Sequence, residues 1–205
     1  MRLFIAVPLP PGLADRAAAC LPPALPGLRP VRPDLMHVTL AFLGWVADDR
    51  LEAAADAACA ATSGHPPFDL SFDHAGRFPA TGRPRAIWLG IGAGKDELTR
   101  LASDTAQAVR RHSFALEERA FAPHLTLARV RVDVSGPGSR SVAAAVEALT
   151  VPEMRMRVDR IAVVQSELSR QGPRYTTRAE ALLPSDASLT AHGASATTSW
   201  PTPRR

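Results

Sequence analysis

One tetrapeptide pattern, His-X-Thr-Leu, occurs twice in this chain of 205 residues, at residues 37–40 and again at 124–127. In an extended strand, side chains two positions apart point to the same face, so each copy presents an imidazole beside a hydroxyl. Two copies that face each other would surround one small space with two titratable groups and two hydroxyl donors. A single His-X-Thr is common, but its repetition, once in each half, predicts an internally duplicated fold.

The apolar pattern of the remaining chain predicts both helices and strands. Short apolar or alternating runs bounded by Gly and Pro predict strands over residues 2–7, 35–43, 68–75, 85–92, 113–117, 124–130, 156–165 and 174–182. Apolar positions at helical spacing predict helices over residues 12–20, 49–62, 96–111 and 141–149. Separate helices and many strands joined by short turns favour an α+β architecture.

Polar and special residues predict how these elements begin and end. Asp48 or Asp49 is expected to cap the second helix, and Asp96 the third. The Pro-rich stretch 22–33 is expected to be a loop, and the Gly-Pro-Gly at 136–138 a turn.

The composition changes near the end of the chain. A hydrophobic content of 46% is enough to bury a core, and the length fits one domain. From Pro184 onward the sequence is rich in Ser, Thr, Ala, Gly and Pro without apolar periodicity. We therefore expect one domain with two lobes over residues 1–183 and a disordered tail over residues 184–205.

The charge balance permits nucleic-acid contact without requiring it. The formal net charge is +4, and Lys95 is the only lysine among 24 basic residues. Arginine presents a planar fork of donors that matches phosphate oxygens. A GC-rich genome would produce the same preference for arginine, so both interpretations stay open.

Two features bear on the cellular compartment. No apolar stretch approaches the roughly 20 residues of a membrane span, and the run from Leu3 to Val7 is too short for a signal-peptide core. Cys20 and Cys59 lie in Ala-rich stretches and look like buried thiols of a reducing compartment. We expect a monomeric, cytoplasmic protein without membrane contact.

Five segments carry a resemblance to a known family. Residues 2–7, 37–44, 83–90, 123–129 and 166–175 read RLFIAV, HVTLAFLG, RPRAIWLG, PHLTLAR and SELSRQGPRY. In this order and with both motif copies, the sequence resembles the two-histidine phosphoesterase superfamily. Within it, the sequence is most similar to the bacterial RNA 2',3'-cyclic phosphodiesterases, also described as 2'-5' RNA ligases.

The resemblance implies a fold and an activity. The fold is a bilobal α+β structure, in which two lobes related by a pseudo-twofold axis each contribute an antiparallel sheet flanked by helices. The motif strands meet in a central cleft. The activity is metal-independent hydrolysis of RNA 2',3'-cyclic phosphate ends to a 2'-phosphate, with reversible 2'-5' ligation, and it needs no cofactor.

The resemblance also assigns roles to the motif residues. His37 would be the proton donor to the leaving ribose oxygen and His124 the proton acceptor from water, since a histidine pKa lies close to working pH. Thr39 and Thr126 would donate hydrogen bonds to the non-bridging phosphate oxygens. The two motifs are nearly symmetric, so the residues alone do not say which histidine is the acid.

Three further residues are candidates for substrate binding. Phe4 and Phe42 correspond to family positions that line the nucleobase pocket, with core packing as the equal alternative. Strict alternation places Phe42 on the face opposite His37, so this role requires a bulge. Arg129 faces away by the same reasoning, but its length could bring it to a phosphate.

Other residues and functions remain as alternatives. Tyr175 and Trp88 are interpreted as structural, and His74 is the only further histidine on an expected strand. No metal-ligand spacing such as HxH or CxxC is present. The same site could act on a cyclic phosphate derived from ADP-ribose or on a 2'-5'-linked oligonucleotide. A non-catalytic module that binds RNA ends is the third alternative, although binding alone does not need two proton carriers.

Overall fold

The computed structural model of the chain describes residues 1–185 except 23, 24, 26, 118, 119, 132, 135 and 171. The strands are β1 (Arg2–Pro8), β2 (Leu28–Pro30), β3 (His37–Trp45), β4 (Phe68–Phe78), β5 (Ala86–Ile91), β6 (His124–Val130), β7 (Met154–Val158), β8 (Arg160–Ser169) and β9 (Gly172–Leu182). The helices are α1 (Pro11–Ala19), α2 (Leu51–Thr62), α3 (Lys95–Arg111) and α4 (Gly136–Glu147), with 3-10 turns η1 (Pro33–Leu35) and η2 (Asp48–Arg50).

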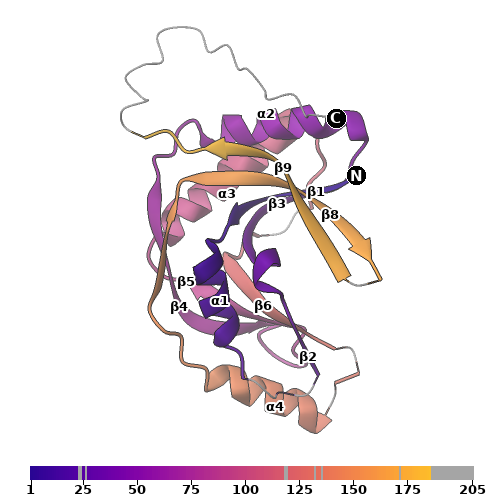
Figure 1. The fold of residues 1–205 in the computed structure, drawn as a ribbon, viewed down its shortest axis with the longest axis vertical. Helices are drawn as coiled ribbons and strands as arrows, with labels where there is room; N and C mark the ends of the chain where they lie inside the picture. The colour runs from indigo at the N-terminus through magenta and orange to yellow at the C-terminus, as the bar shows by residue number, and fades with distance from the viewer. Residues whose placement is uncertain are drawn as a thin grey trace, which may run out of the picture.

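The strands form two antiparallel sheets. Sheet A has the order β3-β1-β8-β9, and sheet B has the order β2-β6-β5-β4-β7. The first motif strand, β3, lies at the edge of sheet A, and the second, β6, lies between β2 and β5 in sheet B. The two motif strands contact each other where the sheets meet. Helices α2 and α3 pack together near one end of the molecule, and α4 lies near the other (Figure 1).

The order of elements repeats along the chain. Apart from the short strand β2 between α1 and β3, the first half runs β1-α1-β3-α2 and the second runs β5-α3-β6-α4. In each half, the motif strand pairs antiparallel with the strand that begins the half, β3 with β1 and β6 with β5. Each half also contributes a strand to the other sheet: β4 of the first half pairs with β5, and β8 of the second half pairs with β1. Strand β7, which directly follows α4, stays in sheet B and pairs with β4. The α+β fold with two antiparallel sheets is therefore confirmed, and the two halves exchange a strand.

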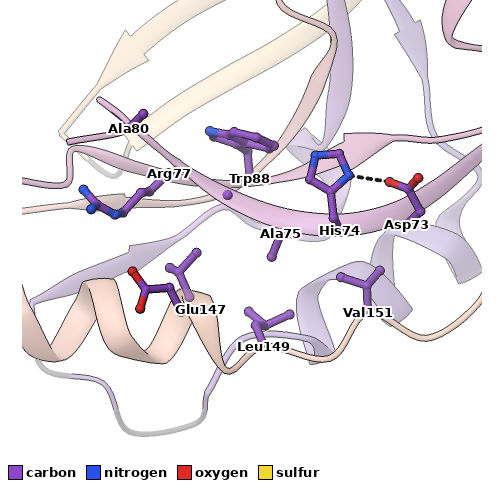
Figure 2. A pocket seen from close by; sticks show the side chains of 11 residues that line it. Asp73, His74, Ala75, Arg77, Ala80, Trp88, Glu147, Leu149 and Val151 are labelled. Carbon is purple, nitrogen blue, oxygen red and sulfur yellow. Dashed lines mark hydrogen bonds and ion pairs between the residues drawn. The ribbon is translucent and has the colours of Figure 1, made fainter.

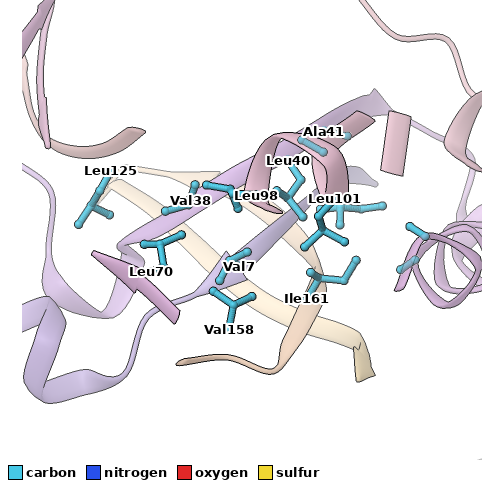
Figure 3. Close-up of a cluster of buried hydrophobic side chains, with 14 of the residues drawn as sticks. Val7, Val38, Leu40, Ala41, Leu70, Leu98, Leu101, Leu125, Val158 and Ile161 are labelled. Carbon is cyan, nitrogen blue, oxygen red and sulfur yellow. The ribbon is translucent and has the colours of Figure 1, made fainter. Parts of the chain in front are cut away.

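The main hydrophobic core belongs to both sheets. Val7 and Val38 of sheet A pack in the same buried cluster as Leu70 and Leu125 of sheet B (Figure 3). Helix α3 adds its apolar stripe to this cluster, with Leu98 and Leu101 fully buried. Removing one such leucine side chain typically costs about 2–5 kcal/mol, so the shared core holds the two lobes together.

Several expected boundaries are wrong. Residues 113–117 form no strand, because the chain turns at Ser113, whose φ is +61°. The expected strand 156–165 is two strands that separate at Asp159, β7 in sheet B and β8 in sheet A. The expected loop 22–33 contains β2, and the Gly-Pro-Gly at 136–138 begins α4 instead of forming a turn.

The expected helix caps are also wrong. No side chain caps α2 or α3, so Asp48, Asp49 and Asp96 do not act as caps. Gly94 occupies the N-cap of α3 with φ of +78°, and a Cβ atom there would meet the Asp69 carbonyl oxygen at 2.2 Å. A close approach of backbone to backbone therefore requires glycine at this helix start.

The chain beyond β9 lies mostly outside the described residues. Leu183 is 4% exposed, and its backbone N–H donates to the Asp159 carbonyl at 2.8 Å. The ordered body therefore extends at least to the expected boundary at residue 183. The expected tail falls, from residue 186 onward, outside the part of the chain that the structure describes.

Candidate active site

Both motif histidines are fixed by the same local contact. Nδ1 of His37 lies 2.8 Å from the Leu35 carbonyl oxygen, and Nδ1 of His124 lies 2.6 Å from the Ala122 carbonyl oxygen. A carbonyl oxygen only accepts hydrogen bonds, so each Nδ1 carries a hydrogen and donates it. The neutral imidazole therefore leaves Nε2 as its free acceptor, and the protonated imidazole presents Nε2–H as a donor.

A β-bulge occurs at the fourth position of each motif. In β3 the pairing with β1 skips Leu40, and in β6 the pairing with β5 skips Leu127. The extra residue reverses the alternation of the strand beyond it. Leu40 and Ala41 are consequently both buried, as are Leu127 and Ala128.

The bulges move two candidate residues onto the motif face. Phe42 is 58% exposed and lies on the same face as His37 and Thr39. Arg129, at the equivalent position of β6, is exposed on the same face as His124. The bulge required for Phe42 is thus present, and the expectation that Arg129 faces away is wrong for the same geometric reason.

Aromatic rings surround His37 on sheet A. Its ring centroid lies 4.7 Å from that of Phe4 and 5.5 Å from that of Tyr175, the latter edge to face. Phe4 is only 2% exposed and also contacts Phe42 at 6.0 Å. Phe4 therefore packs beneath the site, as the core-packing alternative expects, whereas Phe42 is open to a ligand.

Sheet B presents its side chains in rows across three strands. His124 pairs with Gly90, which pairs with His74. A Cβ atom on Gly90 would lie 2.2 Å from Nε2 of His74, so this ring lies flat across the glycine. In the next row Thr126 pairs with Trp88, and Trp88 pairs with Gly76.

His124 also packs against aromatic rings. The ring of Phe78 meets that of His124 edge to face at 4.9 Å, and the ring of Trp88 lies 6.3 Å away. Phe78 was outside the expected strand 68–75, which continues to residue 78, so the sequence did not predict this contact. Trp88 and Tyr175 were expected to be structural only, although both lie beside a motif histidine.

Burial and nearby positive charge lower the pKa of both motif histidines. Burial lowers the pKa of His37 below its ordinary value, and the positive charges of His124 and Arg129 lower it further. Burial likewise lowers the pKa of His124, and Arg129 adds to that shift. In each case the hydrogen bond to the backbone carbonyl partly opposes the effect. The charge of Arg129 therefore lowers the pKa of both imidazoles, in agreement with the contact between β3 and β6.

The motif threonines are available as donors. Thr39 and Thr126 are half-buried beside their histidines, and neither hydroxyl has a hydrogen-bond partner within the described part of the chain. Helical threonines such as Thr105 instead donate to a backbone carbonyl, here that of Leu101 at 2.7 Å. The site thus combines two imidazoles, two free hydroxyls and one guanidinium.

A separate pocket of about 440 Å³ is lined by residues of β4, by Trp88 and by residues at and after the end of α4 (Figure 2). His74 lines one end of it, where Nδ1 is hydrogen-bonded to the Asp73 carboxylate. Glu147 and Leu149, at and just after the end of α4, line the opposite wall. Neither His37 nor His124 lines this pocket, so the candidate chemistry lies elsewhere.

Metal, membrane and thiol features complete the description of candidate sites. Among the residues that the structure describes, no three His, Cys, Asp or Glu side chains converge to hold a metal ion. The helices in the described ranges are too short or too polar to cross a bilayer. Cys20 and Cys59 are free thiols, and Cys59 is exposed, contrary to its expected burial.

Comparison with known proteins identifies the family. A sequence model described as the 2'-5' RNA ligase superfamily matches residues 13–170. The chain is 31% identical over 177 residues to an RNA 2',3'-cyclic phosphodiesterase of Archaeoglobus fulgidus, covering 85% of this chain and 96% of that protein. It is also 31% identical over 183 residues to the protein of the same name from Escherichia coli, covering 85% and 92%.

Solved structures show the same fold. A crystal structure of a Thermus thermophilus protein superposes with a TM-score of 0.71 at 28% identity, covering 91% of this chain and 100% of that chain. Escherichia coli LigT in complex with 3'-AMP superposes with a TM-score of 0.70 at 28% identity, covering 89% and 97%. The chain therefore belongs to the 2'-5' RNA ligase superfamily.

Proposed function

We propose that this protein hydrolyses RNA 2',3'-cyclic phosphate ends to 2'-phosphates, using His37 and His124 as the acid–base pair. The observation that carries the proposal is the matched geometry of the two motifs. Each imidazole is held through Nδ1 by a backbone carbonyl, and each lies beside a threonine hydroxyl without a partner in the described chain. Two relatives named RNA 2',3'-cyclic phosphodiesterase support the same substrate class.

The proposed reaction is a single displacement at phosphorus. Nε2 of His124 accepts a proton from water as the water oxygen bonds to phosphorus, and the bond from phosphorus to O3' breaks. Nε2–H of His37 donates its proton to O3', which leaves a 3'-hydroxyl and a 2'-phosphate. A positioned acid or base of this kind is worth about 10²–10⁴ in rate.

The environment of the pair sets its protonation. The lowered pKa of each histidine favours the neutral form in the free protein, which suits His124 as a base. The negative charge of a bound phosphate would raise the pKa of the nearby imidazoles, so substrate binding itself favours the protonated donor. Thr39 and Thr126 would donate to the non-bridging oxygens, where negative charge grows in the transition state.

The ligation reaction uses the same groups in the same roles. The 5'-hydroxyl of a second RNA takes the place of water, and its attack on the cyclic phosphate produces a 2'-5' linkage and a 3'-hydroxyl. Cleavage of that 2'-5' linkage is the reverse of ligation, and microscopic reversibility requires that His37 is then the base and His124 the acid. The superfamily name is consistent with this second outcome.

We also propose that the protein acts as a cytoplasmic monomer. Its two free thiols fit a reducing compartment. Sedimentation at several protein concentrations tests the oligomeric state, and a mass that rises with concentration would contradict this part of the proposal.

The test of the function is product analysis under chelation. Purified protein in EDTA is incubated with a nucleoside 2',3'-cyclic phosphate, an RNA with the same end, an ADP-ribose cyclic phosphate and a 2'-5'-linked oligonucleotide. We expect phosphorus NMR to show a 2'-phosphate from the first two substrates. A 3'-phosphate product, or turnover of only the third or fourth substrate, would overturn the assignment.

A further inference from the structure

The motif face of β3 continues past Phe42. The pairing of β1 with β3 skips a second residue, Leu43. The next residue, Gly44, adopts a φ of +72°. This second bulge reverses the alternation again, and Trp45 becomes the direct partner of Arg2.

The alternation of β1 shows which face this pair occupies. Phe4 and Ala6 lie on the motif face. Arg2 lies in the same strand two residues before Phe4, so alternation places it on that face as well. Trp45 shares the face because paired residues of antiparallel strands point the same way. The motif face therefore carries three successive cross-strand pairs: Ala6 with Thr39, Phe4 with Phe42, and Arg2 with Trp45.

Trp45 differs from the other aromatic residues of this face. Its side chain is 80% exposed, whereas Phe4 is 2% exposed, and it makes no ring contact within the described residues. The Arg2 guanidinium has no ion pair or side-chain hydrogen bond in the same part of the chain. An exposed indole beside an unpaired cation is the combination that binds single-stranded nucleic acid, through base stacking and phosphate contact.

The support beneath this pair is rigid. The Val46 N–H donates to the Met1 carbonyl at 2.8 Å, which continues the β1–β3 pairing beyond Trp45. The nearby Asp48 carboxylate lies 3.0 Å from the Met1 amino group. The positive charge of this amino group offsets the negative charge of Asp48, which reduces the repulsion of a phosphate bound nearby. The indole is therefore held on a strand end and not on a free loop.

The spacing matches successive nucleotides. Because of the bulges, each step from Thr39 to Phe42 and from Phe42 to Trp45 spans about two regular strand positions, or roughly 7 Å. One nucleotide of an extended single strand covers a step of this size. A terminal base on Phe42 would thus place the preceding base within reach of Trp45.

We infer that Trp45 and Arg2 form a binding subsite for the second-to-last nucleotide of an RNA 3' end. The base of that nucleotide stacks on the Trp45 indole, and the Arg2 guanidinium contacts the phosphate that joins it to the terminal nucleotide. The inference rests on the proposed function and specifies its substrate as an oligonucleotide rather than a mononucleotide.

The experiment compares two substrates, a mononucleotide 2',3'-cyclic phosphate and a dinucleotide with the same end. The measured quantity is the ratio of kcat/KM for the dinucleotide to that for the mononucleotide. We expect Trp45→Ala to lower this ratio by about 5- to 150-fold, the usual effect of losing one stacked base. Trp45→Phe should keep most of the ratio, and Arg2→Ala should reduce the salt dependence of the dinucleotide reaction.

Matched controls separate the outcomes. Leu182→Ala removes another exposed apolar side chain, 69% exposed, and should not change the ratio. A variant that merely folds poorly lowers both rates and leaves the ratio unchanged. If wild type hydrolyses neither substrate, the proposed function fails. If wild type hydrolyses both and Trp45→Ala keeps the ratio, the subsite is overturned, and a change in oligomeric state with the same ratio would assign Trp45 to a protein contact.

Discussion

The two motif strands have the same geometry but different surroundings. Each carries a histidine tied to a backbone carbonyl, a threonine and a bulge at the fourth motif position. After the bulge, β3 places Phe42 on the motif face, whereas β6 places Arg129 there. The duplicated scaffold therefore supplies equal imidazole and hydroxyl groups, and the residue after the bulge is apolar on β3 and cationic on β6.

The largest effects are expected from the histidines. His37→Ala and His124→Ala should each lower kcat by about 10²–10⁴, because each removes a positioned acid or base. The double variant should lose much less than the product of the two effects, since the pair acts as a unit. Steady-state kinetics on a cyclic phosphate measures both, with His65→Ala as the control, because His65 pairs with Asp104 instead.

The pH dependence of the same variants separates the two roles. A base must be deprotonated, so it produces the acidic limb of the pH–rate profile, and an acid produces the alkaline limb. Loss of His124 should therefore remove the acidic limb, and loss of His37 the alkaline limb. The opposite result would exchange the roles, and near wild-type turnover would remove that residue from the mechanism.

A smaller loss is expected from the threonines. Thr39→Ala and Thr126→Ala should each lower kcat on the order of 10²-fold, because each removes one donor to the transition state. Serine at either position should restore part of the rate, since it keeps the hydroxyl. Thr99→Ala is a suitable control because its hydroxyl donates to the Lys95 carbonyl on a helix. A loss of stability without a change in kcat would indicate a packing role only.

Substitution of the two residues after the bulges, Phe42 and Arg129, should affect different properties of the enzyme reaction. Phe42→Ala should weaken nucleotide binding by about 5- to 150-fold through lost stacking. Arg129→Ala should instead move the pH–rate profile, because the Arg129 charge lowers the pKa of both histidines. Removing that charge raises both pKa values, so both limbs should move to higher pH.

The control for this contrast is Arg131→Ala, since the Arg131 side chain pairs with Asp133 on the exposed surface. Arg131→Ala should leave the pH–rate profile unchanged. The contrast between β3 and β6 would be contradicted if Phe42→Ala moved the pH–rate profile, or if Arg129→Ala left both limbs of that profile unchanged.

The smallest effect is expected outside both lobes. Truncation after Leu183 should leave the melting temperature and turnover on a mononucleotide essentially unchanged, because residues 184–205 lack the apolar periodicity needed to pack. Thermal unfolding and steady-state kinetics measure both. A melting temperature several degrees lower would show that the removed residues pack on the body.

The sequence predicted most of the site because repetition is visible without a structure. The histidines and threonines follow from the motif pair, and the strand 124–130 is reproduced as β6. The position of Arg129 could not be predicted, because alternation assumes a regular strand and the bulge leaves no distinctive residue pattern. The separation of 156–165 at Asp159 was equally hidden, since residues on both sides of Asp159 are extended and only the tertiary fold assigns them to different sheets.

The exchanged strands have a consequence for how the molecule unfolds. β1 lies between β3 of its own half and β8 of the other, and β5 lies between β6 and the exchanged β4. Neither half can open without breaking the sheet of the other, so partial unfolding of one lobe is costly, and the pairings join residues distant in sequence. The two imidazoles therefore gain and lose their working geometry in one cooperative transition.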